Sequence, residues 1–553
     1  MNRIGIILVF SISFLLALLA LPATGLAQQP TVGAAVNAAS FLNANLPNGK
    51  LAQGGMFVLF GTGMGPATLE NSNPYPFPTQ VAGTSVRVTV GGASVDCLIV
   101  YSSAGQVAAI LPSSAPVGSG TLTVTYNGQT SAPFSVQVAA SNFGTFSINQ
   151  GGSGPGVILD ANTNQPNTLV SAANPGQLMD IWGTGLGPVA GDEAAGPLPG
   201  NQGNLNVLVT VGSVQAEIVY QGRSGCCAGI DQIRFRVPSG QIGCYVPVSL
   251  SVQGVASNFT TMSIAESGST CSDPFSFTAQ DLQVLQGSGQ FRSAVTGLTR
   301  VRSFNPAIGE TRADTAHASF IRYNLQQIIS NSGAYPSIGS CTVVQITNNP
   351  AVGFAGLNAG TISLSGAAGS HNLQLNSPGL HTLSFIPPFG GIQVPGIPGT
   401  VTDGTVLNPG NYTFTGTGGS DVGAFNVSMN FPALFEWTNR GSINNVNRSQ
   451  PLTITWTGGL AGYQIIITGT SPLSIETVGG AYFICVANAT AGTFTVPASI
   501  LSAIPPSAPG FGGAPTGSLT VGHVRFGDRF NVSGVDLAIT SYLDFIGGAV
   551  AYQ

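Results

Sequence analysis

The sequence is most unusual for how little charge it carries. Only 6% of its 553 residues are Asp, Glu, Lys or Arg, against roughly a quarter in an average soluble domain, and Lys50 is its one lysine. Because proteins bind nucleic acids by neutralising many phosphates with cationic side chains, this composition excludes a nucleic-acid-binding function. Long surface helices held by ion pairs between successive turns are excluded too, because their charges are missing.

Glycine and proline are abundant instead, with 76 Gly and 36 Pro, and apolar residues make up an ordinary 43%. Segments of alternating apolar and polar residues, such as Val86, Val88 and Val90 with polar residues between them, recur along the chain. Turn-forming residues separate these segments at intervals of about 8–12 residues. Short strands with one buried face follow from this pattern. It predicts an all-β protein of tandem immunoglobulin-like β-sandwiches followed by further β-sandwich units.

A targeting segment is predicted at the N-terminus. Arg3 precedes an apolar run over residues 4–21, and the small residues Gly25 and Ala27 follow. This order is typical of a secretory signal peptide, here residues 1–27, with an uncleaved membrane anchor as the alternative. No later apolar run approaches the length of a membrane span, so we expect no transmembrane segment after cleavage. We therefore expect a secreted, extracellular or cell-surface protein.

A long repeat organises the first half of the chain. Residues 54–66, GGMFVLFGTGMGP, return as residues 176–188, GQLMDIWGTGLGP, at an offset of 122. In a second matched pair, SVRVTVG at 85–91 corresponds to NVLVTVG at 206–212. A unit of about 120 residues is too long for a solenoid repeat, so each copy is expected to be a domain. The predicted domains are an immunoglobulin-like repeat 1 over 28–147 and repeat 2 over 148–274.

Several spaced motifs of this region resemble a known family. They are VNAASF at 36–41, the two FGTGxGP-type elements, VTVGG at 88–92 and CCAGIDQI at 226–233. Over about residues 36–274 the chain resembles the Solibacter-type uncharacterised domain of acidobacterial secreted proteins, which is similar to IPT/TIG immunoglobulin-like modules. The resemblance implies an immunoglobulin-like fold and an exported protein, and it brings no catalytic residues. The first copy departs from the pattern because it lacks the double cysteine.

Comparison of the copies locates an insertion. Four residues, 102–105, separate two matched segments in the first copy, whereas eleven, 221–231, separate them in the second. The insertion of seven residues carries Cys226 and Cys227, which have no counterpart in repeat 1. We therefore expect repeat 2 to contain a disulfide-rich loop.

Four of the seven cysteines are confined to repeat 2: Cys226, Cys227, Cys244 and Cys271. In an exported protein cysteines are disulfide candidates before they are metal ligands. Because adjacent cysteines rarely bond each other, we expect Cys226 and Cys227 to pair separately with Cys244 and Cys271. A zinc site made of the four thiolates is the alternative, but such sites usually have a two-residue spacer. We expect no metal.

The remaining cysteines are Cys97, Cys341 and Cys485. Cys97 aligns with Ala216 of the second copy, which indicates an interior position for a small side chain, so a structural, buried thiol is expected. Cys341 and Cys485 either form a disulfide that joins the two C-terminal units or remain two buried thiols.

The second half is predicted to contain two further units. Residues 275–430 are expected to form a β-rich domain with one short helix within 316–330, and residues 431–553 an immunoglobulin-like β-sandwich. Five arginines fall in a stretch of 31 residues: Arg292, Arg300, Arg302, Arg312 and Arg322. They suggest either a surface for phosphate or acidic polymers, or ion pairing and solvation at a domain edge. The second interpretation is favoured, because acidic residues lie close by.

No catalytic motif is recognisable. The glycines of residues 61–65 lack the spacing and the lysine of a phosphate-binding loop, and they are expected to form a sharp strand exit. Asp160, Asn162 and Asn164 mimic the start of a calcium loop but fit an Asx-type turn equally well. We expect no cofactor.

Two functional classes remain. The favoured one is a non-catalytic secreted protein whose modules act as spacers, adhesins, or binders of extracellular polysaccharide or surface proteins. Tyr75 and Phe77, in an extended aromatic loop, are the candidate binding residues, with a core-capping role as the alternative. The other class is a secreted hydrolase, glycan- or peptide-directed, with a site in the C-terminal half. The scarcity of His, Asp and Glu argues against it, because general acid–base catalysis needs them.

Overall fold

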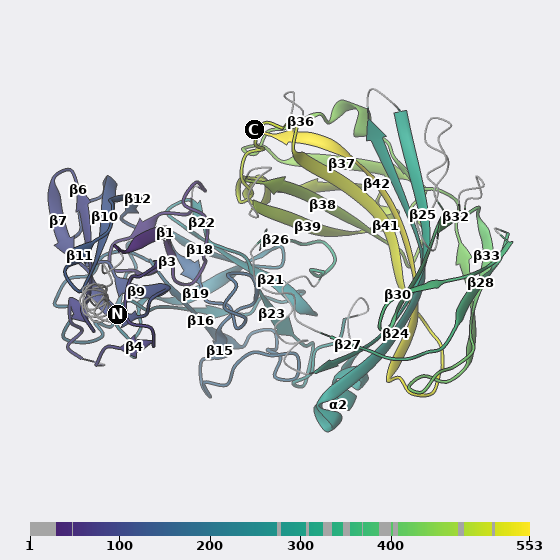
Figure 1. Ribbon diagram of the computed structural model, residues 1–553, viewed down its shortest axis with the longest axis horizontal. Coiled ribbons are helices and arrows are strands. Elements are labelled where there is room, and N and C mark those ends of the chain that lie inside the picture. The colour runs from purple at the N-terminus through teal and green to yellow at the C-terminus, as the bar shows by residue number, and fades with distance from the viewer. Residues whose placement is uncertain are drawn as a thin grey trace, which may run out of the picture.

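The structure is a computed structural model of the whole chain, and Figure 1 shows two smaller β units followed by a larger one. The residues that it describes are 29–46, 48–73, 75–273, 278–305, 309–324, 335–346, 354–367, 369–385, 400–401, 407–473, 480–510 and 515–553. The predicted signal peptide lies outside these residues. The predicted all-β class is confirmed, because strands account for nearly all of the regular structure.

Repeat 1 is a sandwich of two sheets around one apolar core. One sheet has the order β1 (Thr31–Asn37), β3 (Met56–Thr62), β9 (Gln106–Ile110), β8 (Leu98–Ser102) and β4 (Glu70–Asn71). The other has β2 (Leu51–Ala52), β12 (Phe134–Ala139), β10 (Gly118–Tyr126), β6 (Thr84–Val90) and β5 (Gln80–Val81), with β7 (Ala93–Asp96) and β11 (Gln129–Thr130) at its edges. Val86, Val88 and Val90 point inward from β6, as their alternation predicted.

Repeat 2 has a related order of strands, but they form one continuous sheet rather than two separate sheets. Its sheet order is β13 (Gly144–Thr145), β16 (Leu178–Thr184), β20 (Asp231–Arg236), β19 (Val214–Arg223), β18 (Val207–Val211), β21 (Gly243–Val252), β23 (Thr260–Ile264) and β14 (Gly154–Pro155). The short strands β15 (Ile158–Asp160), β17 (Gly200–Asn201) and β22 (Val255–Ala256) pair at the margins. The parallel pair β12 with β2 in repeat 1 has its counterpart in β23 with β14. The tandem repeat seen in the sequence is therefore a structural repeat.

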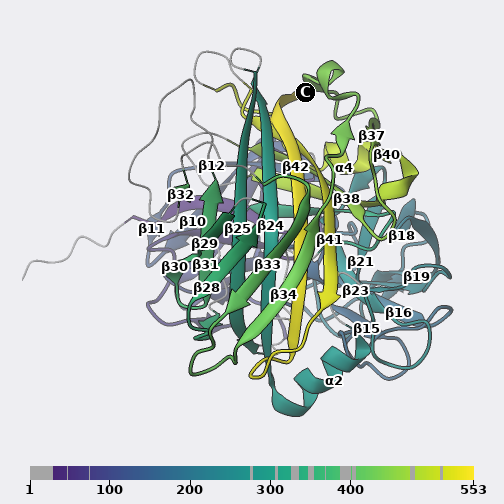
Figure 2. The same cartoon turned by 90° about the vertical axis from the view of Figure 1, so that its right-hand side faces the viewer.

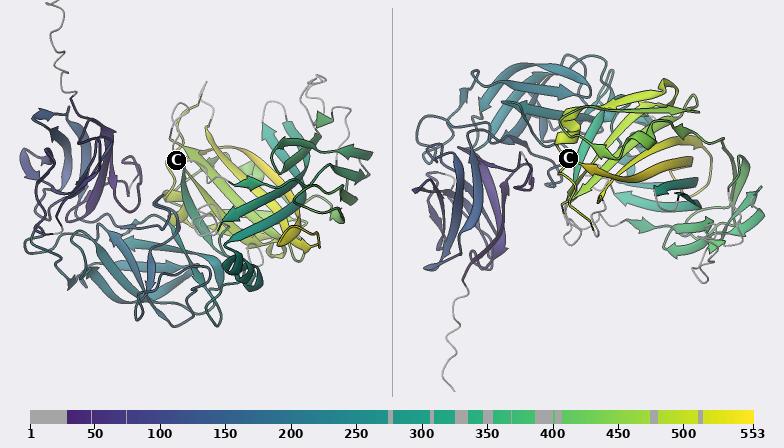
Figure 3. Two further views of the ribbon diagram at one scale, coloured as in Figure 1. Left: turned by 60° about the horizontal axis from the view of Figure 1, so that its bottom comes forward. Right: turned by 90° about the horizontal axis from the view of Figure 1, so that it is seen from above.

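The boundary between the repeats lies slightly earlier than the predicted 147/148. Gly144 and Thr145 pair with β16, and Phe143 packs in the core of repeat 2. The two repeats meet at a bend, as both panels of Figure 3 show.

The third unit, residues 278–553, is built on one large curved sheet. Its order is β26 (Cys341–Ile346), β39 (Gly480–Asn488), β38 (Gln464–Pro472), β41 (Gly517–Arg529), β42 (Leu537–Tyr552), β24 (Gln290–Asn305), β25 (Gly309–Asn324), β31 (Leu380–Phe385) and β30 (Gln374–Ser377). Three short strands pair at its margins: β27 (Ala355–Gly356), β32 (Thr400–Val401) and β36 (Asn445–Val446).

Two smaller sheets pack against the large one and share its apolar core. The first has the order β29 (Gly369–Asn372), β28 (Ile362–Gly366), β33 (Gly410–Gly416) and β34 (Phe425–Phe431), and Figure 2 shows β33 and β34 crossing in front of the long strands. The second has β35 (Glu436–Trp437), β37 (Leu452–Thr457) and β40 (Thr493–Val496). Short helical turns lie at η1 (Arg440–Ser442), η2 (Ala489–Ala491) and α4 (Ala498–Ser502).

The predicted division into units 275–430 and 431–553 is wrong. Strand β34 crosses the predicted boundary, and β24 from the first segment pairs in parallel with β42 from the second over twelve residue pairs, Ser293–Leu537 to Phe304–Gly548. One apolar core contains Phe320 and Phe425 together with Phe431 and Phe483. Sequence patterns show where strands are, whereas long-range pairing decides which strands share a sheet.

The helix predicted within 316–330 is also wrong for the part that the structure describes, because residues 316–324 lie in β25. Residues 325–330 lie outside the described residues. A helix that the sequence analysis missed, α2 (Ala279–Ser288), begins with a capping box formed by Thr278 and Asp281. Among the described residues, no helix has the length and apolar character to cross a membrane.

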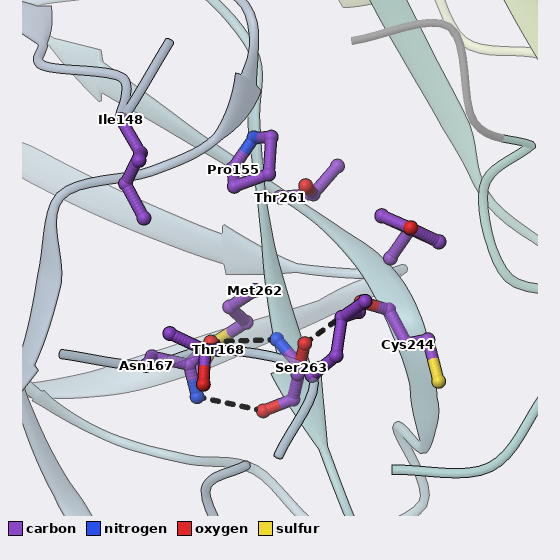
Figure 4. Close-up of a pocket in the computed structure, with 10 residues that line it drawn as sticks. Ile148, Pro155, Asn167, Thr168, Cys244, Thr261, Met262 and Ser263 are labelled. Atoms are coloured by element: carbon purple, nitrogen blue, oxygen red, sulfur yellow. Dashed lines mark hydrogen bonds between the residues drawn. The ribbon is translucent and has the colours of Figure 1, made fainter. Parts of the chain in front are cut away.

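Helix α2 joins the third unit to repeat 2. Leu282 and Leu285 of α2 pack in one apolar cluster with Leu169, Tyr245 and the Cys244–Cys271 pair of repeat 2. Beside this cluster is a narrow cavity of about 10 Å³, which is about the room that one water molecule needs. Figure 4 shows the hydrogen bonds beside it, two between Asn167 and Ser263 and one from the Ser263 hydroxyl to the Cys244 carbonyl. The cavity is too small to be a ligand site.

Candidate functional site

The cysteines of repeat 2 pair differently from the prediction. Cys226 bonds Cys227, and Cys244 bonds Cys271. The predicted pairing of Cys226 and Cys227 with Cys244 and Cys271 is wrong because the two pairs lie apart. The first is exposed on a loop, whereas the second is buried under α2. The alternative of one zinc site shared by the four thiolates fails for the same reason.

The other cysteines fall where one of the predicted alternatives placed them. Cys341 and Cys485 lie directly opposite each other on β26 and β39 and form a disulfide. This pair joins two strands of one sheet rather than two units. Cys97 is a free, fully buried thiol in the core of repeat 1, and burial raises its pKa. Ala216, its counterpart, is buried in repeat 2.

The inserted loop of repeat 2 lies against repeat 1. Strand β19 runs on to Arg223 and β20 begins at Asp231, so residues 224–230 form the loop. The backbone N–H of Ala228 donates to the hydroxyl of Tyr75 at 3.0 Å. Ala228 also packs in an apolar cluster with Leu98 and Ile110 of repeat 1.

Tyr75 and Phe77 belong to the same contact. Their rings meet edge to face with centroids 5.1 Å apart, and both are half-buried. The backbone N–H of Phe77 donates to the carbonyl of Ala194 in repeat 2 at 2.9 Å. Tyr75 and Phe77 therefore meet the loop that carries the adjacent cysteines, through Ala228, at the junction between the repeats.

Arg223 fixes this junction. Its side chain is 2% exposed, and it donates to Asp231 at 2.8 Å, to the Gly187 carbonyl at 2.9 Å and, across the junction, to the Gly54 carbonyl at 2.5 Å. Burial raises the pKa of Asp231 to about 6, although Arg223 and the backbone N–H of Leu186 act in the opposite direction. Breaking such a buried pair leaves an uncompensated charge, so the junction is held firmly.

A carboxylate of repeat 2 completes the junction from the other side. Glu193 accepts from the backbone N–H of Ser113 at 2.7 Å and from its hydroxyl at 2.9 Å, and Arg223 lies 3.7 Å away. The Ser113 hydroxyl oxygen also accepts from the N–H of Val189 at 2.9 Å. Side chains of one repeat therefore satisfy backbone groups of the other.

An open groove of about 370 Å³ lies over these contacts. Both repeats line it, with Leu98, Pro112, Ser113 and Ser114 from repeat 1 and Val189, Gly191, Asp192, Glu193 and Ala194 from repeat 2. Asp192 and Ser114 are exposed on its walls. None of these lining residues carries a positive charge. Tyr75 and Phe77 contact Leu98 and Ala194 at one side of the groove.

Two of the five arginines lie inside the third unit rather than on a surface patch, whereas Arg292 and Arg322 are exposed. Arg300 and Arg302 are buried inside the unit and pair with Asp314 at 2.8 Å and Asp544 at 3.1 Å. Burial raises the pKa of Asp544 to about 6 against the influence of Arg302. Ion pairing, one part of the favoured interpretation, is confirmed, but the location at a solvated domain edge is wrong for these two.

One pair in the third unit has a nucleophile next to a base. The Oγ of Ser541 and the Nε2 of His317 lie 3.2 Å apart, on strands either side of Gly297. Burial lowers the pKa of His317 to about 4, and its other nitrogen lies 3.5 Å from the hydroxyl of Thr299 rather than against a carboxylate. Ser541 is 1% exposed in mid-strand, so the pair does not present an accessible nucleophile.

The remaining sequence candidates have local structural roles. Asp160 accepts from the N–H groups of Asn162 and Thr163 at 2.8 and 2.7 Å, which is the predicted Asx-type turn. Gly63 and its counterpart Gly185 have positive φ angles at the predicted strand exits. Within the described residues, no group of three or more His, Cys, Asp or Glu side chains is placed to hold a metal ion.

Arg223, Glu193 and Ser113 carry the junction, although none of them was a candidate from the sequence. A signal was available for Arg223 and Asp231, because they flank the insertion in a chain with few charges. Nothing in the sequence connects Ser113 with Glu193, which are 80 residues apart and meet only through the bend between the repeats.

Scans against protein-family models and curated proteins give no match for this chain. Among solved structures, it is similar to SGBP-B from a complex xyloglucan utilization locus in Bacteroides uniformis, with 11% identity, a TM-score of 0.18, and coverage of 73% of this chain and 98% of that one. It is also similar to SGBP-B of the Bacteroides ovatus mixed-linkage glucan utilization locus in complex with a mixed-linkage heptasaccharide. The identity is 12%, the TM-score is 0.16, and the match covers 85% of this chain and 96% of that one. For Sidekick-1 immunoglobulin domains 1–4 the identity is 10%, the TM-score is 0.13, and the match covers 91% of this chain and 96% of that one. Values this low say nothing about what the present chain binds.

Proposed function

We propose that the chain is an exported, non-catalytic binding protein whose groove between repeats 1 and 2 holds a neutral polysaccharide. Three disulfides support export, because such bonds persist in oxidising compartments. The resemblance of residues 36–274 to the Solibacter-type secreted domain is part of the same proposal. The observation that carries it is a groove lined by both repeats at a junction fixed by Arg223.

The chemistry of the groove favours a neutral, hydroxyl-rich ligand. Asp192 and Ser114 offer exposed oxygens that accept hydrogen bonds from hydroxyl groups, while Leu98 and Val189 supply apolar contact for the carbon face of a sugar ring. The lining residues include no cation, and the two carboxylates repel anionic polymers. Because Arg223 and Glu193 hold the walls in place, little ordering is needed on binding.

A glycan array with the full-length chain tests this proposal. Soluble neutral polysaccharides that score on the array are then titrated against the protein by calorimetry. Ser114→Trp fills the groove, and it is expected to weaken binding at least about tenfold, because it removes the space for the ligand.

Ser135→Trp is the matched control, because Ser135 is also an exposed serine of repeat 1 but lies on β12, outside the groove. It should leave binding unchanged. Equal affinity for Ser114→Trp and the wild type, or a preference for anionic chains, would contradict the proposal.

A further inference from the structure

The Cys226–Cys227 disulfide differs from the other two in its access to solvent. Both of its cysteines are exposed on the 224–230 loop. Each of the other four disulfide cysteines is at most 7% exposed: Cys244, Cys271, Cys341 and Cys485. Thiol–disulfide exchange requires a thiolate to reach a disulfide sulfur, so external thiols reach this pair first.

The same loop makes the contact between the repeats. Directly after the disulfide, Ala228 donates to Tyr75, and its methyl group packs on Leu98 and Ile110. Gly229 follows with a φ angle of 72°, and its Cα lies so close to Ile110 that an added Cβ would be 2.9 Å from that side chain. Its carbonyl accepts from the Thr184 hydroxyl at 2.5 Å. The two residues that touch repeat 1 therefore directly follow the disulfide, which constrains the backbone of the turn that leads into them.

Few other contacts hold the turn itself. Its ends are joined by the N–H of Ser224 and the carbonyl of Ile230 at 3.0 Å, and the N–H of Ile230 donates to the carbonyl of Cys227 at 3.3 Å. The Ser224 hydroxyl lies 3.5 Å from the Cys226 sulfur and 3.3 Å from the Cys227 carbonyl. The side chains of Arg223 and Asp231 anchor the loop's two ends, but not the part between them.

We propose that Cys226–Cys227 is a thiol–disulfide exchange site whose reduction loosens the contact between the two repeats. A dithiol reductant attacks one sulfur, which forms a mixed disulfide and releases the other cysteine as a thiolate. The second thiol of the reductant then resolves the mixed disulfide. The protein gains two electrons and two protons as two thiols, and the reductant leaves as a cyclic disulfide. Exposure of the sulfurs and the adjacent contact with Tyr75 carry this proposal, and it does not depend on a polysaccharide ligand.

The test uses the full-length protein and dithiothreitol. Thiols formed at increasing reductant concentration are trapped with N-ethylmaleimide and assigned by peptide mass spectrometry. Cys226 and Cys227 are expected to be labelled before any other disulfide cysteine. In the same samples, amide hydrogen exchange of 224–231 and 75–81 should accelerate about fivefold or more, the equivalent of one lost hydrogen bond. Exchange in β38 should not change.

Two variants separate the disulfide from the contact that it positions. Cys226→Ser with Cys227→Ser should show the faster exchange without reductant, and dithiothreitol should add nothing further. Tyr75→Phe removes the acceptor of the Ala228 N–H, so this amide should exchange faster while the disulfide stays intact. The proposal is overturned if Cys244 or Cys341 is labelled first. It is equally overturned if Cys226 and Cys227 are reduced with no change in exchange at 75–81.

Discussion

Several charged side chains of this protein are buried rather than exposed. Arg223, Arg300 and Arg302 are each at most 3% exposed, and each donates to a buried aspartate. A buried charge is tolerated only when it is paired and hydrogen-bonded, so these few charges carry more structural weight than surface ones. Scarcity of charge in the sequence therefore does not mean that the charges are unimportant.

His523 gives a prediction at this scale. Its ring is fully buried, stacks on Tyr463 with centroids 4.6 Å apart and contacts Phe435 and Tyr542, and burial lowers its pKa to about 4. In the unfolded chain the imidazole of His523 binds a proton near pH 6.5, whereas in the folded protein it does so only near pH 4. Folding stability therefore falls as the pH drops through this window. Between pH 7.5 and 5 the loss from this one histidine is about 2 kcal/mol.

His523→Phe keeps an aromatic ring in the cluster and cannot titrate. The free energy of unfolding, measured in urea at pH 7.5 and pH 5, should therefore fall by about 2 kcal/mol less in the variant than in the wild type. His317 and the buried aspartates titrate in both proteins, so their contributions cancel in the comparison. Parallel pH dependence of the two proteins would show that His523 becomes protonated in the folded state.

At the scale of strands and helices, the sequence pattern is reliable where one face of a strand is buried. It predicted β6 and the matched strands of both repeats from their alternation. It failed for residues 316–324, because strand β25 lies between β24 and β31 in the sheet, and this pairing overrides a local preference for helix. The helix α2 was missed because only two of its apolar residues, Leu282 and Leu285, are buried.

The disulfide between β26 and β39 gives a prediction at this scale. Cys341 and Cys485 are 144 residues apart in sequence, and closing a loop of this size stabilises the folded state by about 5 kcal/mol in the chain-entropy model. Cys341→Ala with Cys485→Ala should therefore lower the free energy of unfolding by up to about 5 kcal/mol.

Cys97→Ala is the control, because it removes a buried thiol without removing a disulfide. It should cost about 1 kcal/mol, as expected for a small cavity. Losses of similar size in the control and in the double variant would mean that the cross-strand bond contributes little beyond its packing. Urea unfolding of the full-length proteins measures all three values.

At the scale of the whole molecule, the junction decides how the first two units act together. Arg223 of repeat 2 donates to the Gly54 carbonyl of repeat 1, and Glu193 accepts from Ser113. Each bond crosses between domains whose cores are separate clusters. The repeats are therefore held at a fixed bend, which keeps the walls of the groove together.

Arg223→Met tests this coupling. It leaves Asp231 as a buried carboxylate without its cation, so the free energy of unfolding should fall by about 3–5 kcal/mol at pH 7.5. The pKa of Asp231 is already raised to about 6 by burial, and loss of the arginine raises it further. Protonation at lower pH then removes the unpaired charge, so the difference from wild type should be smaller at pH 5 than at pH 7.5.

Arg223→Met with Asp231→Asn is the matched control, because it removes both charges of the pair. It should recover part of the lost stability, and its difference from wild type should vary less with pH. A single variant as stable as the wild type would show that the buried pair does not hold the junction.

The sequence alone determined the all-β class, the tandem repeat, the insertion in its second copy and the interior position of Cys97. Each of these depends on local alternation or on direct comparison of the copies, which needs no knowledge of distant contacts. Tertiary structure alone decided that residues 278–553 share one core, that Cys226 bonds Cys227, and that Tyr75 and Phe77 meet the inserted loop. These features depend on pairs of residues far apart in the chain, such as Ser293 with Leu537 and Tyr75 with Ala228. The physical reason is that many long-range pairings satisfy the same local pattern, and only the packing of the complete chain selects one of them.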